Sequence, residues 1–194
     1  VDMARWMGYG KSWHDGCKIN VHISGKRGPE GLLKEFPKLS TEARNLITIE
    51  NDEMGHGLEH TLEVAHKIAL VLDIHHHWIR AEEYIQPNDD RVKKVIDSWR
   101  GVRPTLHYSY SRDEHLAVAN LGDKTHTEMH DIKMLLERGC KKQKLRAHSD
   151  LLPNRAVNDW ALSFGEHFDI QTEAKGKNIA AEQLYRQAVE KSVI

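Results

Sequence analysis

Five short apolar stretches of this chain end at or near a histidine or a carboxylate. The stretches are rich in β-branched residues, and the segments between most of them have the apolar spacing of helices. Strands that alternate with helices are typical of parallel βαβ units, so we predict an α/β fold. The expected strands lie at 18–24, 45–52, 68–76, 103–111 and 167–175, and the expected helices at 58–69, 89–99, 126–138, 156–167 and 178–191.

The polar residues at the strand ends form a set with the chemistry of metal ligands. Because parallel strands place their carboxyl ends at one edge of a sheet, we expect these residues to share one site. Imidazoles and carboxylates without thiolates suit Mn²⁺, Zn²⁺ or Fe²⁺, and this set exceeds the needs of one ion. The set comprises His22, Glu50, Asp73 with His75 to His77, His107 and Glu173.

Two or three such ions would support phosphodiester hydrolysis, in which one activates a water and another stabilises the leaving oxygen. Metal-dependent isomerases and epimerases use similar ligands, so the residue types alone leave the reaction open. Each residue also has a structural interpretation. His22 could be a hydrogen-bonded strand-end residue, Glu50 a helix cap and Glu173 a partner of Lys175 on the surface. The shared position at strand ends favours the metal site.

Composition places the chain among folded globular proteins. Of its 194 residues, 39% are hydrophobic and 29% charged, and we expect one domain over 1–194 with a polar insertion at 112–147, between the last two strands. The formal net charge of −1 neither indicates nor excludes a nucleic-acid partner. Cys17 and Cys140 lie far apart, and no apolar run reaches the roughly 18 residues of a membrane span, so a cytoplasmic protein without a membrane partner is expected.

Several motifs, in order along the chain, resemble those of the ultraviolet damage endonuclease family. They are "LITIEND", "VLDIHHHWI", "RPTLHYS", "RAHSD" and "FDIQTEAKGK", with a weaker match in "KINVHISGKRG". The resemblance runs from about residue 15 to 190. This family (UvdE/UvsE-like) is one branch of the barrels that include endonuclease IV and the xylose isomerases.

The resemblance implies a TIM (β/α)₈ barrel of the xylose isomerase-like type, of which this chain has strands 4 to 8, and Mn²⁺ as the expected metal. It implies a DNA repair endonuclease that nicks damaged double-stranded DNA 5′ to pyrimidine dimers and 6-4 photoproducts, at the nucleoid in a bacterium or phage. The implied metal ligands are His22, Glu50, Asp73, His76, His107, His148 and Glu173, of which Glu50, Asp73, His107 and Glu173 are also the catalytic candidates.

DNA contacts are expected from basic residues of the loops beyond the strand ends, since phosphate contacts supply much of the affinity for DNA. Trp78 and Tyr108 could insert at a distorted base pair. The basic candidates are Lys26, Arg27, Arg80, Arg112 and Lys175, with the run "KKQKLR" at 141–146.

The chain departs from the family pattern in three respects. Thr105 occupies a position where the family has a lysine, the 112–147 insertion is long, and the first three strands of the barrel have no counterpart. We expect those strands to come from the full-length protein or another chain. Strand alternation nominates His75 as a ligand, whereas the spacing of the family nominates His76, which we adopt. The alternatives are a sugar isomerase or epimerase of the same superfamily and an inactive, truncated remnant.

Overall fold

The computed structural model describes residues 1–23 and 25–192, which form two compact units. The first unit comprises Val1–Leu72 and Asn88–Pro104, and the second comprises Asp73–Pro87 and the described residues from Thr105 onward. Both units combine parallel strands with helices, so the α/β class is confirmed. A single domain over 1–194 remains a prediction.

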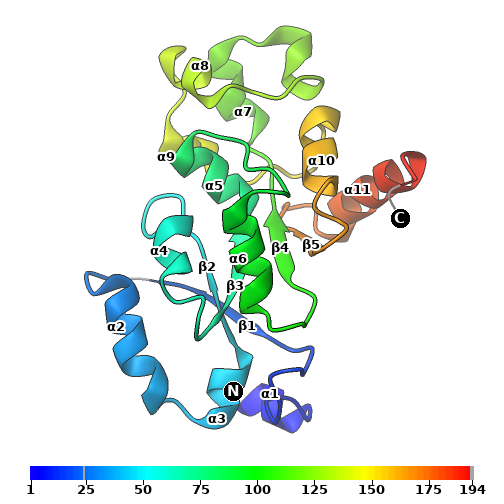
Figure 1. The fold of residues 1–194 in the computed structure, drawn as a ribbon. Coiled ribbons are helices and arrows are strands. Elements are labelled where there is room, and N and C mark those ends of the chain that lie inside the picture. Colours follow the sequence, from blue (N-terminus) through cyan, green and yellow to red (C-terminus); the bar gives the residue numbers. More distant parts are fainter. Residues whose placement is uncertain (24, 193–194) are drawn as a thin grey trace. The chain divides into compact units, whose positions relative to one another are not determined.

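The first unit contains three parallel strands, β1 (Ile19–His22), β2 (Ile47–Glu50) and β3 (Ala69–Asp73), in the order β1-β2-β3 (Figure 1). The last residue of β3, Asp73, belongs to the second unit. All five residues of β3 are buried, as expected for a parallel strand covered on both faces. The helices of the first unit are α1 (Asp2–Trp6), α2 (Gly28–Glu35), α3 (Thr41–Leu46), α4 (Leu58–Leu62) and α6 (Asp90–Ser98), with a 3₁₀ turn, η1, at Phe36–Lys38.

Trp99, just after α6, joins that helix to β3. Its ring packs with Ala69 and Val71, and its indole Nε1 donates a 2.6 Å hydrogen bond to the carbonyl of Leu70. The backbone N–H of Leu70 donates to Ser98 Oγ at 3.0 Å. The buried indole N–H of Trp99 therefore has a hydrogen-bond acceptor, and these contacts hold α6 against β3.

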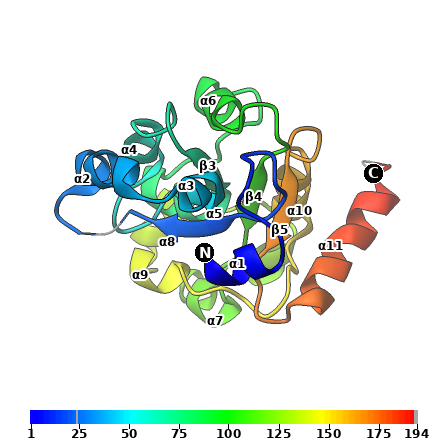
Figure 2. The ribbon, with the colours of Figure 1, turned by 90° about the horizontal axis from the view of Figure 1, so that it is seen from below.

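The second unit contains two parallel strands, β4 (Thr105–Tyr108) and β5 (Asp169–Thr172). Figure 2 shows the long helix α11 beside β5 and α10. No helix in the described ranges is both long and apolar enough to cross a membrane. The helices of this unit are α5 (Ile74–Ala81), α7 (Asp113–Leu116), α8 (Ile132–Glu137), α9 (Lys142–Leu145), α10 (Arg155–Leu162) and α11 (Asn178–Glu190), with 3₁₀ turns η2 (Ala117–Ala119) and η3 (Gly122–His126).

A row of aromatic side chains forms the core of the second unit. Tyr84 meets Trp160 edge-on with ring centroids 4.8 Å apart, and Trp160, Phe164 and Phe168 continue the row at spacings of 6.0 and 6.1 Å. The indole Nε1 of Trp160 donates to the carbonyl of Ile85 at 2.8 Å. Edge-to-face packing of this kind stabilises aromatic cores beyond the area that it buries.

The five expected strands are confirmed in their places, each shorter than its apolar stretch. The expected helices at 89–99, 156–167 and 178–191 correspond to α6, α10 and α11, while those at 58–69 and 126–138 shrink to α4 and α8. The predicted end of the third strand was wrong. The third strand ends at Asp73 rather than at 76, because the Asp73 side chain caps a helix that begins with the next residue.

The segment expected to be an insertion, 112–147, leaves and rejoins the unit at one point. Ser111 and His148 form an isolated antiparallel bridge, and the N–H of Arg112 donates to the carbonyl of Ala147 at 3.1 Å. Farther out, Tyr110 Oη donates to the carbonyl of Thr125 at 2.7 Å, and Asn154 Nδ2 donates to the same carbonyl at 2.9 Å. The segment is therefore tied to the unit both at its base and midway along its length.

Replacing Tyr108 by Phe should destabilise the protein. Tyr108 is 0% exposed, and its hydroxyl donates to Asn158 Oδ1 at 2.7 Å, so the variant leaves a buried acceptor without its donor. We expect a loss of about 1–2 kcal/mol in the free energy of unfolding, measured by urea denaturation. Tyr185→Phe, on the exposed surface of α11, is the control and should change nothing. An equal effect of both variants would contradict the prediction.

Candidate functional site

Asp73 both ends β3 and begins α5. Its Oδ1 accepts a 2.7 Å hydrogen bond from the backbone N–H of His76, which is the standard cap of a helix start. The side chain is 0% exposed, and its Oδ2 lies 3.6 Å from His76 Nδ1. The strand-alternation argument for His75 therefore fails, because 75 and 76 lie in the first turn of a helix.

His75 is held between two serine hydroxyls. Its Nδ1 lies 2.7 Å from Ser109 Oγ and its Nε2 3.0 Å from Ser111 Oγ. Since the hydroxyl of Ser111 donates to the carbonyl of Leu145 at 2.7 Å, it accepts from the Nε2–H of His75, and Ser109 donates to Nδ1.

Burial, and then the neighbouring His76 and His148, lower the pKa of His75 well below its usual value. A neutral ring with both nitrogens bonded to serines is a support of the site rather than a ligand.

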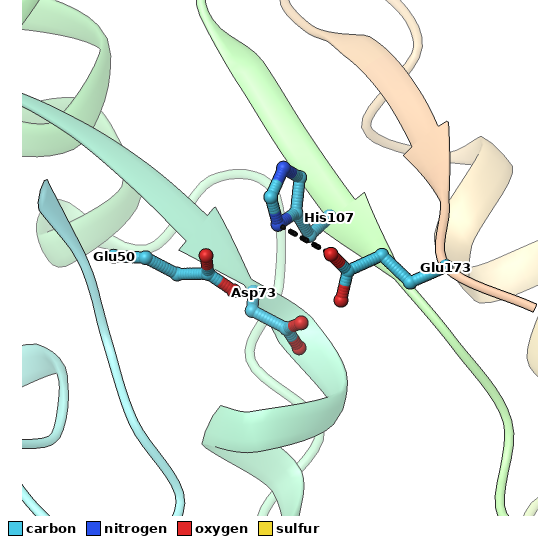
Figure 3. A group of neighbouring side chains, drawn as sticks. All are labelled: Glu50, Asp73, His107 and Glu173. Atoms are coloured by element: carbon cyan, nitrogen blue, oxygen red, sulfur yellow. Dashed lines mark ion pairs between the residues drawn. The ribbon is translucent and has the colours of Figure 1, made fainter. Parts of the chain in front are cut away.

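Asp73, His107 and Glu173 come together at the ends of β3, β4 and β5, where each offers one ligand atom within 4.8 Å of the others. Figure 3 shows the side chains of His107 and Glu173 facing each other, with the dashed line marking the ion pair between them. In that pair His107 Nδ1 lies 3.3 Å from Glu173 Oε1. His107 Nε2 lies 3.1 Å from Gln171 Oε1, so each ring nitrogen of His107 faces an oxygen atom.

His148 lies beside this cluster with its tautomer also fixed. Its Nδ1 donates to the backbone carbonyl of Glu173 at 2.7 Å, so Nε2 is the basic nitrogen. The ring centroid lies 6.3 Å from that of His76. The guanidinium of Arg112 donates through Nε to the carbonyl of His148 at 3.0 Å, which holds the backbone of this residue in place.

The donor set of the second unit fits a divalent cation. Asp73 and Glu173 offer carboxylate oxygens and His107 offers an imidazole nitrogen, which are ligand types of divalent transition metals. The second-layer contacts to backbone carbonyls and amides are those that commonly orient metal-binding imidazoles. The cluster of Asp, Glu and His can therefore bind a metal ion.

In the first unit, the predicted ligands His22 and Glu50 are paired in register at the ends of β1 and β2. His22 Nε2 lies 3.6 Å from Glu50 Oε2, and His22 Nδ1 lies 3.9 Å from Asp52 Oδ2. Glu50 is 3% exposed and accepts a short hydrogen bond from the amide of Asn20. The two residues thus form a second group of metal-ligand type within their own unit, and Glu50 is also labelled in Figure 3.

The basic residues predicted to contact DNA fall into two groups. Lys26, Arg27 and Lys175 are exposed and follow the strands β1 and β5, and Arg80 is partly exposed in the last turn of α5. Arg112 instead contacts its own unit, through His148 and through an ion pair with Glu114 at 3.2 Å. Their contact with DNA remains a prediction.

The two aromatic residues proposed to insert into DNA are buried, so that prediction was wrong. Trp78 is 5% exposed and stacks on His75, and Tyr108 is 0% exposed and bonded to Asn158. Both belong to the core of the second unit, which is the ordinary place for aromatics near strand ends.

Several residues of the site were missed from the sequence although a signal was present. Asn20 precedes His22 by two positions, Gln171 precedes Glu173 by two, and Ser109 follows His107 by two. Side chains two apart on a strand share a face, so alternation outward from each ligand would have nominated them. Each contributes a hydrogen bond that orients a candidate ligand or its support.

The geometry defines an α/β protein with a carboxylate–imidazole site at the ends of parallel strands. Residues 10–193 match the family described as UV-endonuclease UvdE, and the chain belongs to this family.

Among its relatives, the UV DNA damage endonuclease of Bacillus cereus strain B4264 is 25% identical over 182 residues, which are 88% of this chain and 48% of the relative. The UV DNA damage endonuclease of Bacillus thuringiensis subsp. konkukian strain 97-27 is 23% identical over 185 residues, which are 89% of this chain and 49% of the relative.

A solved structure titled "Crystal Structure of SacUVDE" superposes with a TM-score of 0.61 and 19% sequence identity. The superposition covers 91% of this chain and 53% of the chain of that solved structure. At this identity the match shows the likeness of the fold. The chain spans about half the length of the curated relatives that it matches.

Replacing His76 by Ala should weaken Mn²⁺ binding on the order of 100-fold, since His76 is next to the carboxylate of Asp73 and presents an imidazole there. The matched control is His77→Ala, whose ring lies 3.1 Å from Glu83. Mn²⁺ affinity is measured by isothermal titration calorimetry on samples whose folding is verified by circular dichroism. An equal loss in both variants would show that the spacing of the family does not identify the ligand.

Proposed function

We propose that this chain is the strand 4–8 part of a metal-dependent UV damage endonuclease that nicks DNA 5′ to pyrimidine dimers and 6-4 photoproducts. Membership of the UvdE family and the names of the relatives support the class of substrate. The observation that carries the proposal is the cluster of Asp73, His107 and Glu173, a set of metal-ligand type at strand ends in which Asp73 and His107 are buried and Glu173 is partly exposed. Such activity would place the protein at the nucleoid of a bacterium or phage.

In this proposal the seven ligands are His22, Glu50, Asp73, His76, His107, His148 and Glu173. Two or three divalent ions, Mn²⁺ in preference to Zn²⁺ or Fe²⁺, would supply Lewis acidity and a nucleophilic water at neutral pH. The residues of the chain set the geometry. Asp73 fixes the turn that presents His76, and the carbonyl of Glu173 orients the ring of His148.

Other residues would bind and align the substrate. Lys26, Arg27, Arg80 and Lys175 would contact phosphates, which position a duplex without reading its sequence. Arg112 would also contact a phosphate, and the hydrogen bond from its Nε to the carbonyl of His148 would hold that candidate metal ligand in place.

The proposal includes strands that this chain does not contain. In the described residues, β1 and β5 each have a neighbouring strand on one side only, and the side chain of Val21 on β1 is 39% exposed. Open strand edges invite pairing with further strands. Since the relatives are about twice as long, we propose that the remaining strands of a closed barrel are supplied by the full-length protein or by another chain.

A protein carrying this chain together with its upstream part should nick a UV-irradiated, 5′-labelled duplex in the presence of Mn²⁺ and leave the unirradiated duplex intact. Product length on a sequencing gel gives the side of the lesion. Absence of nicking by protein with full metal content would rule out the nuclease, and turnover of a sugar would favour an isomerase. Activity of the longer protein but not of this chain alone would show that the missing strands are needed.

Glu173→Gln should lower the nicking rate on the order of 1000-fold, because several kcal/mol of the stabilisation from the metal would depend on the ligand charge. Glu182→Gln, which removes the same charge from the surface of α11, is the control and should retain full activity. Rates are measured in single-turnover nicking assays. Unchanged activity of Glu173→Gln would exclude this residue from the catalytic set.

A further inference from the structure

The first unit carries a groove of about 450 Å³ that the proposed nuclease site does not use. Its volume is within the range of pockets that hold small molecules. The groove has an aromatic wall and a basic rim, and its lining includes Trp13, Phe36, Arg44, His66, Lys67 and Arg100.

The positive charge of this groove is uncompensated. In the described part of the chain, Arg44, Lys67 and Arg100 form no ion pair, whereas Arg5, Lys142 and Arg155 do. None of the residues that line the groove is Asp or Glu. Three cations without carboxylates around one concave surface create a positive potential that attracts anions.

The cations are also partly preorganised. The guanidinium of Arg100 stacks on Trp13, 4.1 Å from the ring centroid, and donates to the carbonyl of Lys67 at 2.8 Å. Lys18 Nζ lies 4.6 Å from the same ring centroid and donates to the carbonyl of Asn45 at 2.8 Å. These contacts hold two positive charges beside the aromatic wall before any ligand arrives.

Arg44 gives an independent sign of a missing partner. Its Nε is buried and has no hydrogen-bond acceptor among the described residues, while its terminal nitrogen donates to Thr41 Oγ1 at 3.2 Å. A buried donor without a partner is rare. Because Nε is shielded from solvent, an anion in the groove would bind to the terminal nitrogens of the guanidinium. The guanidinium presents a fork that matches the oxygens of a phosphate.

The groove is distinct from the candidate metal ligands. Trp13, Asn45 and Lys67 each precede one of the strands β1, β2 and β3, so the groove lies where the chain enters the sheet. His22 and Glu50 lie at the opposite, carboxyl ends of β1 and β2.

We propose that this groove binds a phosphate group, with Arg44 and Lys67 as the direct ligands and Arg100 as a fixed neighbouring charge. The phosphate could come from a free anion, such as inorganic phosphate or a mononucleotide, or from a nucleic-acid backbone. The shared chemistry is a tetrahedral oxyanion with one or two charges, which suits one guanidinium and one ammonium.

The test uses the Arg44→Gln/Lys67→Gln double variant and a matched control. Lys93→Gln/Lys94→Gln removes two exposed cations from α6 of the same unit, away from the groove. Two probes distinguish the sources. Inorganic phosphate is titrated while the indole N–H of Trp13, which donates to the carbonyl of Trp99, is followed by NMR, and an undamaged duplex is titrated by fluorescence anisotropy at several salt concentrations.

If the groove binds a free anion, inorganic phosphate should shift the Trp13 signal in the wild-type and control proteins. The groove variant should bind phosphate at least about tenfold more weakly. If the groove binds a nucleic-acid backbone, the slope of log Kd for the duplex against log salt concentration should become smaller in the groove variant only. The expected decrease is about 0.9 for each DNA phosphate that the variant no longer neutralises. Equal behaviour of the groove and control variants toward both probes would overturn the proposal. Mn²⁺ affinity should stay unchanged in the groove variant, so a failure of the nuclease proposal would be recognised separately.

Discussion

The hydrogen bond from the backbone N–H of His76 to the carboxylate of Asp73 is the interaction on which the second unit depends most. By accepting the N–H of His76, the carboxylate ends β3 and starts α5 within a single residue, and so it presents His76 at the carboxyl end of the strand. The same carboxylate is fully buried beside His107 and Glu173. One side chain thus serves as helix cap and as candidate metal ligand, which ties the geometry of the site to the backbone rather than to a mobile loop.

Much of this arrangement could be predicted from the sequence. Strands that end in ligands follow from β-branched runs and the polar residues after them, and the five strands lie where those runs predicted them. The start of α5 could not be read from the pattern, because "DIHHH" has no apolar period of either kind and its structure depends on a local hydrogen bond of Asp73. The roles of Ser109 and Ser111 were equally hidden. They depend on residues 34 to 36 positions away, and no local pattern encodes such a pairing.

The histidines differ in function although their sequence context is nearly the same. His75, His76 and His77 are adjacent, yet they contact two serines, Asp73 and Glu83 respectively. A helix rotates successive side chains by about 100°, so three neighbours necessarily face three environments. Thr105, in contrast, lies at the start of β4 and pairs in register with Asp169 of β5.

The closed base of segment 112–147 has a consequence for how this segment can change in length. Because Ser111 pairs with His148 and Arg112 bonds to Ala147, the distance that the segment must span is fixed independently of its length. The entropy of closing such an excursion grows only logarithmically, by about 0.6 kcal/mol for each doubling. Additions at positions of the segment away from the contacts of Thr125 and Leu145 should therefore leave His148 in place. New surface, or a grafted second domain, can be appended at such positions without moving the candidate metal ligands.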